Sequence, residues 1–490
     1  MMRLSLSSCL RTVAKRPYRY LKYRARRALF RSQWLLARPG CLLRSRGRSC
    51  VEPTFSLVVP VYNVAPYLDD FLTSLTRQTW FREDSLEVLL VDDGSSDASG
   101  AICQKWAARY PNVINYHYKP NGGLASARNA GIRMATGQWI GFPDPDDLLA
   151  PQYLESVVRS LEAVNDDSGV SLVACYVKPF IEKTYEVRDD HPLNGRFEEG
   201  VRLSRLKGPD PDIHVVMNAA FFRRDHIQEQ ALECSEHVRP HGEDLHFTAR
   251  YVATFGDPHA LFAADAVYYY RKRASQDSAM NQAGDSEALY TTLIETCIVD
   301  LLNKFAPGER RLPVWLQRLL LYHIGWHVRR GIYNPKAHEG MPEATIERHK
   351  ELVDYVLAYL DVDVIDNFAF PPLDQTLRDA LVAGFKGARV LPQRVVVEGR
   401  DRASGGLTVS WLAGDDSPPL AFYLKGAVVE PAEQASKIYR FCGEPLANEY
   451  RTTLDWPGVG EWTAYSQGQY VPFALRGGKT VSKLAKGDVR

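Results

Sequence analysis

Three apolar runs in the N-terminal part of the chain each end in a cluster of polar residues. They span Phe55–Asn63, Leu89–Asp97 and Trp139–Asp147, and the last two end in carboxylates. Between the runs, apolar positions recur at helical spacing, for example along residues 64–78. Strands that alternate with helices and deliver acidic residues at their ends predict a βαβ sheet. Ligands bind such sheets outside the carboxyl ends of the strands, so we expect the functional site there.

After residue 280 the pattern changes twice. Long runs with helical periodicity come first: Leu289–Phe305, Val314–Arg329 and Ile346–Leu360. Short β-rich runs separated by glycine and proline follow: Arg394–Glu398, Leu407–Leu412, Leu420–Leu424 and Trp462–Tyr465. We predict four parts: a basic arm over residues 1–50, an α/β domain over 51–280, a helical region over 281–388, and a small β-rich domain over 389–490.

The arm differs from the rest in charge. No acidic residue precedes Glu52, and between Tyr18 and Leu36 basic and aromatic residues interleave with apolar ones near helical spacing. A basic amphipathic helix with aromatic side chains is typical of contact with an anionic membrane surface. The alternatives are an unstructured solubilising arm, residues upstream of the true start, or a transit peptide.

Composition narrows the class of protein. The chain has 490 residues, of which 45% are hydrophobic and 24% charged, with a net charge of +1. A transmembrane helix needs a run of about 18 apolar residues, and the sequence contains none. No apolar segment followed by a small-residue cleavage site marks a secretory signal. We therefore predict a cytoplasmic protein, peripheral at the inner face of the cell membrane.

The eight cysteines are scattered, and no two of them form a C-x-x-C pair. This spacing favours free thiols in a reducing compartment over a disulfide framework or a zinc site.

The densest carboxylate cluster is Asp144-Pro-Asp-Asp147, at the end of the third apolar run. Carboxylates this close repel one another, and a hard divalent cation would relieve the repulsion. Mg²⁺ and Mn²⁺ keep coordination positions open for phosphate oxygens, so the cluster suits a metal that bridges a diphosphate. The alternative is an acidic helix-capping loop.

The Asp144–Asp147 cluster is one of five motifs that follow one another along the chain. They are Val59-Pro-Val-Tyr-Asn63, Val91-Asp-Asp-Gly-Ser-Ser-Asp97, Asn121-Gly-Gly-Leu-Ala-Ser-Ala-Arg-Asn-Ala-Gly131, Asp144-Pro-Asp-Asp147 and His241-Gly-Glu-Asp-Leu-His-Phe247. Together they resemble the family-two glycosyltransferases, inverting enzymes with the GT-A nucleotide-sugar fold. The resemblance covers roughly residues 54–280.

On the donor side, the resemblance implies that Pro60 and Tyr62 border the nucleobase. It implies that Asp93 accepts a hydrogen bond from the uracil N3–H, which favours a UDP-linked donor, with Asp92 as a structural partner. Arg128 would neutralise the diphosphate or hold the base edge, since a planar cation with several donors suits both tasks.

The same resemblance assigns Asp144 to the ribose or the metal and Asp146 to the metal as its chief ligand. In this family the middle position of the D-x-D is often Ser or Ala, and Pro145 departs from that pattern.

On the acceptor side, Asp244 stands where the family keeps its catalytic base, because inversion needs one carboxylate to take the acceptor hydroxyl proton. Glu243 would bond backbone or acceptor. Arg271 and Arg273 would contact phosphate, and their alternative is a solvated basic strand end.

These assignments predict a bacterial glycosyltransferase. It would transfer a sugar from a nucleotide-diphosphate donor to a cell-surface glycan, a teichoic-acid-like polymer or a lipid-linked acceptor, with inversion and with Mn²⁺ or Mg²⁺. The helical region would support homo-oligomers or shape the acceptor groove. The rival hypothesis is a catalytically inactive glycan-binding or scaffold protein. We expect no nucleic-acid partner, because the acidic site would repel phosphate without a metal.

Overall fold

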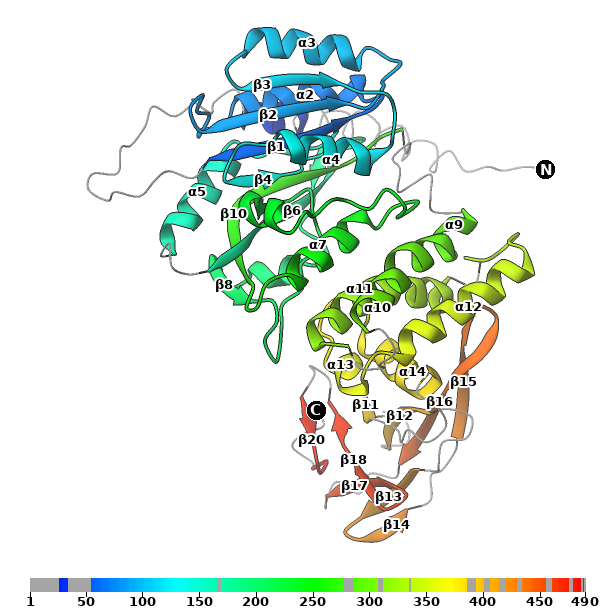
Figure 1. The fold of residues 1–490 in the computed structure, drawn as a ribbon. Helices are drawn as coiled ribbons and strands as arrows, with labels where there is room; N and C mark the ends of the chain where they lie inside the picture. Colours follow the sequence, from blue (N-terminus) through cyan, green and yellow to red (C-terminus); the bar gives the residue numbers. More distant parts are fainter. Residues whose placement is uncertain are drawn as a thin grey trace, which may run out of the picture. The chain divides into compact units, whose positions relative to one another are not determined.

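A computed structural model describes most of the chain. The described residues are 26–33, 54–164, 169–275, 286–306, 312–334, 336–385, 394–400, 406–413, 420–429, 434–454, 461–475, 479–485 and 488. The chain divides into two compact units, Met1–Gly284 and Asp285–Arg490, and each is described by itself (Figure 1).

The first unit begins with the predicted parallel βαβ sheet. Its strands lie in the order β3-β2-β1-β4, and every pair among them is parallel. The strands are β1 (Phe55–Val61), β2 (Leu86–Asp92), β3 (Ile114–Tyr118) and β4 (Trp139–Gly141). The connecting helices are α2 (Ala65–Thr76), α3 (Ser99–Arg109) and α4 (Leu124–Met134). Strand β1 is buried along its whole length, as expected for a central strand whose two faces are covered.

The sheet continues as β9-β6-β10-β5, which makes it mixed. Strand β9 is antiparallel to both β4 and β6, whereas β6 and β10 run parallel. The strands are β5 (Leu148–Leu149), β6 (Val170–Ile181), β7 (Glu186–Val187), β8 (Arg202–Arg205), β9 (Ala220–Arg223) and β10 (His259–Lys272). The helices are α5 (Tyr153–Ala163), η2 (Asn194–Phe197), α6 (Arg224–Glu229) and α7 (Glu243–Ala253). Together with the first four strands they form the predicted α/β domain.

Close packing fixes α4 on the sheet. A Cβ added at Gly131 would lie 2.2 Å from a methyl carbon of Val58 in β1. Only glycine therefore allows this helix to approach the strand so closely. The consequence for the site is that α4, which carries Arg128, has a defined position relative to the strand ends.

A short segment of the basic arm packs on this unit as a helix over residues 26–33. The Phe30 ring stacks on Phe180 with 4.4 Å between centroids, and Arg26 pairs with Glu186 at 3.2 Å. The neighbouring Leu29 is 75% exposed. The remainder of the arm, predicted as an amphipathic helix from Tyr18 to Leu36, lies outside the described residues.

The second unit joins helices to two β-sheets. Its helices are α9 (Glu287–Tyr290), the π-helix η3 (Ile294–Val299), α10 (Asp300–Phe305), α11 (Val314–Tyr333), α12 (Glu343–Ala358), α13 (Val362–Asp366) and α14 (Gln375–Phe385). One sheet has the order β15-β16-β12-β11-β19-β20 and the other β14-β13-β17-β18. The strands are β11 (Val395–Arg400), β12 (Leu407–Ala413), β13 (Leu420–Leu424), β14 (Ala427–Val429), β15 (Gln434–Phe441), β16 (Glu444–Leu454), β17 (Trp462–Ser466), β18 (Gln469–Val471), β19 (Phe473–Ala474) and β20 (Thr480–Val481).

The two sheets share one core, to which Trp411 of the first and Phe422 and Trp462 of the second contribute. Such an arrangement of two sheets is a sandwich. Helix α14 packs closely on the first sheet, since a Cβ at Gly384 would meet Leu446 at 2.3 Å. The predicted boundary between residues 388 and 389 thus falls inside a single compact unit.

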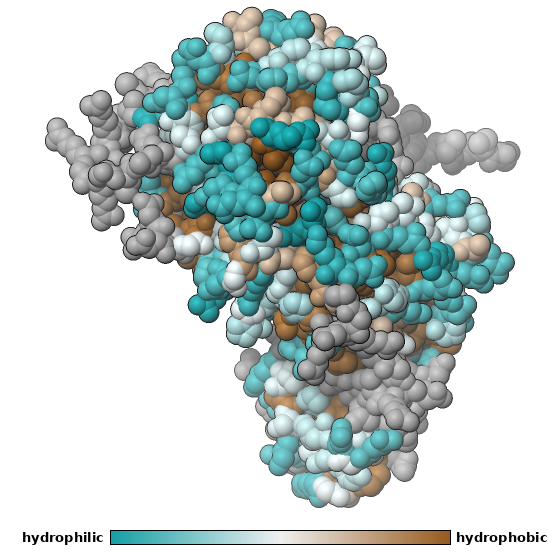
Figure 2. All heavy atoms as spheres, viewed as in Figure 1, coloured by the Kyte–Doolittle hydropathy of each residue, from teal (hydrophilic) through white to brown (hydrophobic). Residues whose placement is uncertain are grey.

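Two properties are relevant to membrane contact: the polarity of the surface, and the length and hydropathy of the helices. On the face drawn in Figure 2, hydrophilic side chains predominate over the described part and apolar ones show in small patches. Among the described helices, none combines the length and the hydropathy needed to cross a bilayer.

Candidate active site

The end of β2 presents two adjacent aspartates with different partners. Asp92 accepts hydrogen bonds from the Ser95 amide at 2.8 Å and the Tyr116 hydroxyl at 2.8 Å. These contacts hold the turn after the strand, so Asp92 lies where a structural partner was expected.

Asp93, predicted to read the nucleobase, is 2% exposed. It accepts from the Lys119 ammonium at 2.5 Å and from the amides of Gly122 and Gly123 at 3.0 and 2.7 Å. Both carboxylate oxygens therefore hold the glycine turn that leads into α4. A nucleobase donor would have to share these oxygens with Lys119 and the turn.

Arg128 connects three carboxylates from two separate motifs. Its guanidinium donates to Asp244 at 2.9 Å, to Glu243 at 3.0 Å and to Asp144 at 3.3 Å. The residue is 1% exposed, so its charge is neutralised by these partners and not by water. These carboxylates raise the pKa of Arg128 against the lowering effect of burial. The structure thus places this arginine among the acidic residues, where sequence reasoning had assigned it to the diphosphate or the base.

The Asp144–Asp147 loop is tied to β10 through Tyr268. The Tyr268 hydroxyl donates to Asp147 at 2.7 Å and accepts from the Asp144 amide at 3.0 Å. Asp147 also accepts from the Arg271 amide at 2.7 Å and is fully buried. The second oxygen of Asp144 accepts from the Asn218 amide group at 2.8 Å. Asp147 therefore positions the loop, while Asp144 and Asp146 remain partly open.

The two arginines predicted to bind phosphate also face this loop. Arg273 donates to Asp146 at 2.8 Å. Arg271 donates to the Asp146 carbonyl at 2.5 Å and pairs with Glu182 at 2.8 Å, and its side chain is only 2% exposed. The structure therefore buries the Arg271 side chain against the Asp144–Asp147 loop and does not expose it at an open surface.

Asp244 lies at the first turn of α7, and its second oxygen accepts from the Met217 amide at 3.2 Å. Burial raises the pKa of Asp244 to about 7, and the Glu243 and Asp144 charges add to the rise while Arg128 opposes it. Burial likewise raises the pKa of Asp144 to about 6, with Arg128 opposing and Asp146 adding. A carboxylate with a pKa near neutrality that keeps part of its surface open is suited to take up a proton.

Comparison with known proteins identifies a family that matches the part of the chain containing most of these residues. The model of the family described as glycosyl transferase family 2 matches residues 56–229, a span that includes Asp93, Arg128 and the Asp144–Asp147 loop. This chain carries a family 2 glycosyltransferase domain. The resemblance drawn from the five motifs is confirmed.

Two curated relatives of this chain come from a bacterium. In Bacillus subtilis (strain 168), the minor teichoic acid biosynthesis protein GgaB is 26% identical over 313 residues, which cover 64% of this chain and 33% of GgaB. The minor teichoic acid biosynthesis protein GgaA of the same strain is 30% identical over 279 residues, which cover 55% of this chain and 58% of GgaA. The chain therefore spans less than two thirds of the length of both relatives.

Among solved structures, S. aureus TarS 1–349 in complex with UDP-GlcNAc has a TM-score of 0.50 and 20% identity, and the match covers 67% of this chain and 86% of that chain. At this identity the likeness shows the fold, which is GT-A as predicted.

The residues of the candidate site fit a hard divalent cation. Asp144 and Asp146 offer carboxylate oxygens from one loop, and Asp244 and Glu243 add negative charge across Arg128. Burial is the main cause of the raised pKa of Asp144, and the neighbouring Asp146 charge adds to it. Oxygen donors in excess of positive charge suit Mg²⁺ or Mn²⁺.

The residues predicted to contact the nucleobase differ in exposure. Tyr62 is 51% exposed in the turn after β1, whereas Pro60 is buried inside the strand. Sequence reasoning did not single out Lys119, Asn218 or Tyr268. Their only signal was proximity to motifs, since Lys119 precedes the glycine turn and Tyr268 begins the segment that contains both arginines.

Proposed function

We propose that this glycosyltransferase transfers a sugar from a UDP-linked donor to a teichoic-acid-like polymer or related cell-surface acceptor, with inversion. The names of two relatives refer to teichoic acid biosynthesis, and the structural neighbour holds UDP-GlcNAc. The observation that carries the proposal is the set of contacts made by Arg128. Its guanidinium bonds both Asp144, in the loop proposed to hold the metal, and Asp244, the proposed base.

Asp244 is the proposed catalytic base. Its oxygen would take the acceptor hydroxyl proton as that oxygen attacks the anomeric carbon and the bond to the nucleotide diphosphate breaks. A pKa of about 7 leaves a substantial fraction of Asp244 ionised at neutral pH and makes it a stronger base than an ordinary carboxylate. Arg128 orients Asp244, because one guanidinium nitrogen bonds both Asp244 and Glu243.

On the donor side, Asp146 and Asp144 would hold Mn²⁺ or Mg²⁺, which neutralises charge on the leaving diphosphate. Arg273 would contact a phosphate, since it already faces Asp146. For Arg271 we propose a positioning role, because its buried guanidinium holds the Asp146 carbonyl and Glu182. Tyr62 would stack against the nucleobase, with Pro60 fixing the end of the strand beneath it.

We further propose that the arm brings the enzyme to an anionic inner membrane surface, with the helix over residues 26–33 anchored by Phe30 and Leu29 turned outward. Sedimentation with anionic and with neutral vesicles at several salt concentrations tests this. Salt-sensitive binding to anionic vesicles alone supports the proposal, and equal binding to both contradicts it. A homo-oligomer, also expected from the sequence, is tested by light scattering.

Calorimetric titration with UDP, GDP and dTDP, with and without Mn²⁺, tests the donor site. We expect Mn²⁺-dependent binding of UDP to the wild type, weakened in Asp146→Ala and retained in Asp244→Asn. The matched control Asp84→Ala changes an exposed aspartate away from the site and should bind as the wild type does. Failure to bind any nucleotide under these conditions would favour the inactive glycan-binding or scaffold alternative.

A further inference from the structure

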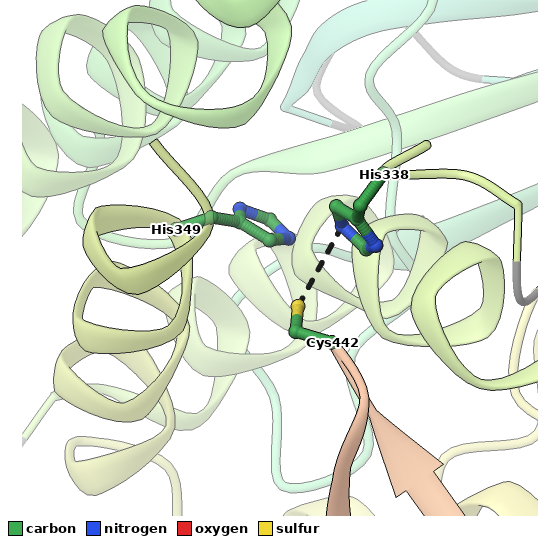
Figure 3. Close-up of side chains that lie close together, drawn as sticks. All are labelled: His338, His349 and Cys442. Carbon is green, nitrogen blue, oxygen red and sulfur yellow. Dashed lines mark hydrogen bonds between the residues drawn. The ribbon is translucent and has the colours of Figure 1, made fainter. Parts of the chain in front are cut away.

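Three side chains from distant parts of the second unit converge on one point. They are His338, in the segment after α11, His349 on α12, and Cys442 in the turn between β15 and β16 (Figure 3). One ligand atom of each lies within 4.8 Å of the others. From the geometry we infer a metal site in the second unit, built for zinc or a similar divalent transition metal and separate from the carboxylate site of the first unit.

The distance between the cysteine sulfur and one histidine nitrogen matches the chemistry of a zinc site. Zinc bonds thiolate sulfur at about 2.3 Å and imidazole nitrogen at about 2.0–2.1 Å in a tetrahedral arrangement, which places a sulfur and a nitrogen ligand about 3.6 Å apart. The Cys442 sulfur and the His338 Nε2 are 3.6 Å apart. Two imidazoles and one thiolate form a borderline-soft set that favours zinc over Mg²⁺ or Mn²⁺.

His349 is already oriented as a ligand. Its Nδ1 lies 2.9 Å from the Tyr290 carbonyl oxygen, and because a carbonyl only accepts, Nδ1 carries the proton. The lone pair is then on Nε2, which is buried and has no hydrogen-bond partner. A buried nitrogen lone pair without a donor costs free energy unless something occupies it. An outer carbonyl that fixes the tautomer is the usual support of a metal-binding histidine.

The cysteine is held in place by its turn. Cys442 and Gly443 are the two central residues of the β15–β16 hairpin, with φ of 52° and 86°. Two-residue turns of this kind favour asparagine at the first position, so cysteine in the left-handed region is unusual. The equivalent residues of two other hairpins, Lys425 and Gln467, are exposed, whereas Cys442 is half-buried and faces His338.

Metal binding requires unprotonated imidazole nitrogens and a thiolate sulfur. A bound cation would displace the thiol proton of Cys442, and the resulting thiolate would offset part of the charge of the cation.

The site would act as a cross-link. His338 and Cys442 are 104 positions apart, and the metal would clamp the tip of the β-hairpin to the helices. The Lys350–Glu444 pair at 2.6 Å already joins the same two segments at the surface. Three protein ligands leave a fourth tetrahedral position for water.

Cobalt substitution of the full-length protein tests the proposal, because only a cobalt–thiolate bond gives intense near-ultraviolet charge-transfer absorption. We expect wild-type protein to bind one Zn²⁺ per chain and to show this absorption when Co²⁺ replaces it. Cys442→Ser should abolish the absorption. His349→Ala should weaken zinc binding at least 10- to 100-fold, the loss typical of an outer-shell partner alone. Asp146→Ala, which alters the carboxylate site, and His117→Ala, which removes an exposed histidine, should retain both signals.

Zinc should also raise the midpoint of thermal unfolding of the wild type and leave that of Cys442→Ser unchanged. Circular dichroism identifies any variant that fails to fold. The wild-type measurements test the proposal even if a variant fails to fold. Absence of zinc and of the thiolate absorption in folded wild type would overturn the proposal. So would thiolate absorption that persists in Cys442→Ser, because the ligand would then be another cysteine.

Discussion

Removing the charge of Arg128 should destabilise the first unit severely. In Arg128→Met the side chain keeps its length, but Asp144, Glu243 and Asp244 lose their common partner. Leaving a buried charge without its partner costs about 3–5 kcal/mol. The arginine is 1% exposed, so water cannot replace it, and we expect a loss in this range.

Urea denaturation at neutral pH without divalent metal measures the effect. Arg128→Lys keeps the charge but cannot bond three carboxylates, so it should lose less, about 1–3 kcal/mol, the cost of unmade hydrogen bonds. Adding Asp244→Asn to Arg128→Met removes one of the stranded carboxylates, and we expect a coupling of about 0.5–3 kcal/mol. A loss below about 1 kcal/mol in Arg128→Met would refute the reasoning, because it would mean that the carboxylates are compensated without the arginine.

Three further predictions follow from the same unit. Gly131→Ala should lower stability by about 1–3 kcal/mol through its clash with Val58, measured by urea denaturation, and a neutral effect would contradict the packing of α4. Tyr268→Phe should cost about 1–3 kcal/mol and reduce transfer, since Asp147 loses a buried donor; unchanged stability and rate would show that the loop does not depend on it. The folded pKa of Asp244, about 7, lies above its ordinary value of 3.8, so its protonation favours the folded state and the wild type should gain stability relative to Asp244→Asn as the pH falls from 7 toward 4. A constant difference between these two proteins across that range would show that the pKa of Asp244 is not raised.

The architecture of the first unit was predictable because it is encoded locally. Buried parallel strands appear in the sequence as continuous apolar runs, and strand β1 is buried along its whole length as such a run predicts. The carboxylates at the ends of the second and third apolar runs were found by the same logic, since parallel strands bring their carboxyl ends to one edge, whereas Asp244 was assigned from the family resemblance.

The connections within the site were not predictable. Arg128 is 116 positions from Asp244 in sequence, and only the fold shows that its guanidinium donates hydrogen bonds to carboxylates. A sequence can suggest that an arginine is functional, but it does not state which of several anions the side chain reaches.

The cysteines illustrate the same limit in the second unit. Their scattered spacing argued against zinc, because metal motifs are recognised by ligands close together in sequence. Cys442 meets two histidines only through tertiary packing of a hairpin on helices, so no local spacing could have indicated it.

The most direct test of the proposed activity is the rate of sugar transfer from UDP-linked donors to a teichoic-acid-like acceptor, compared between wild type and Asp244→Asn at saturating donor. A general base contributes about 10²–10⁴-fold, so we predict a loss of that size in Asp244→Asn, with nucleotide binding retained. Transfer by Asp244→Asn at the wild-type rate would contradict the assignment of Asp244 as the base.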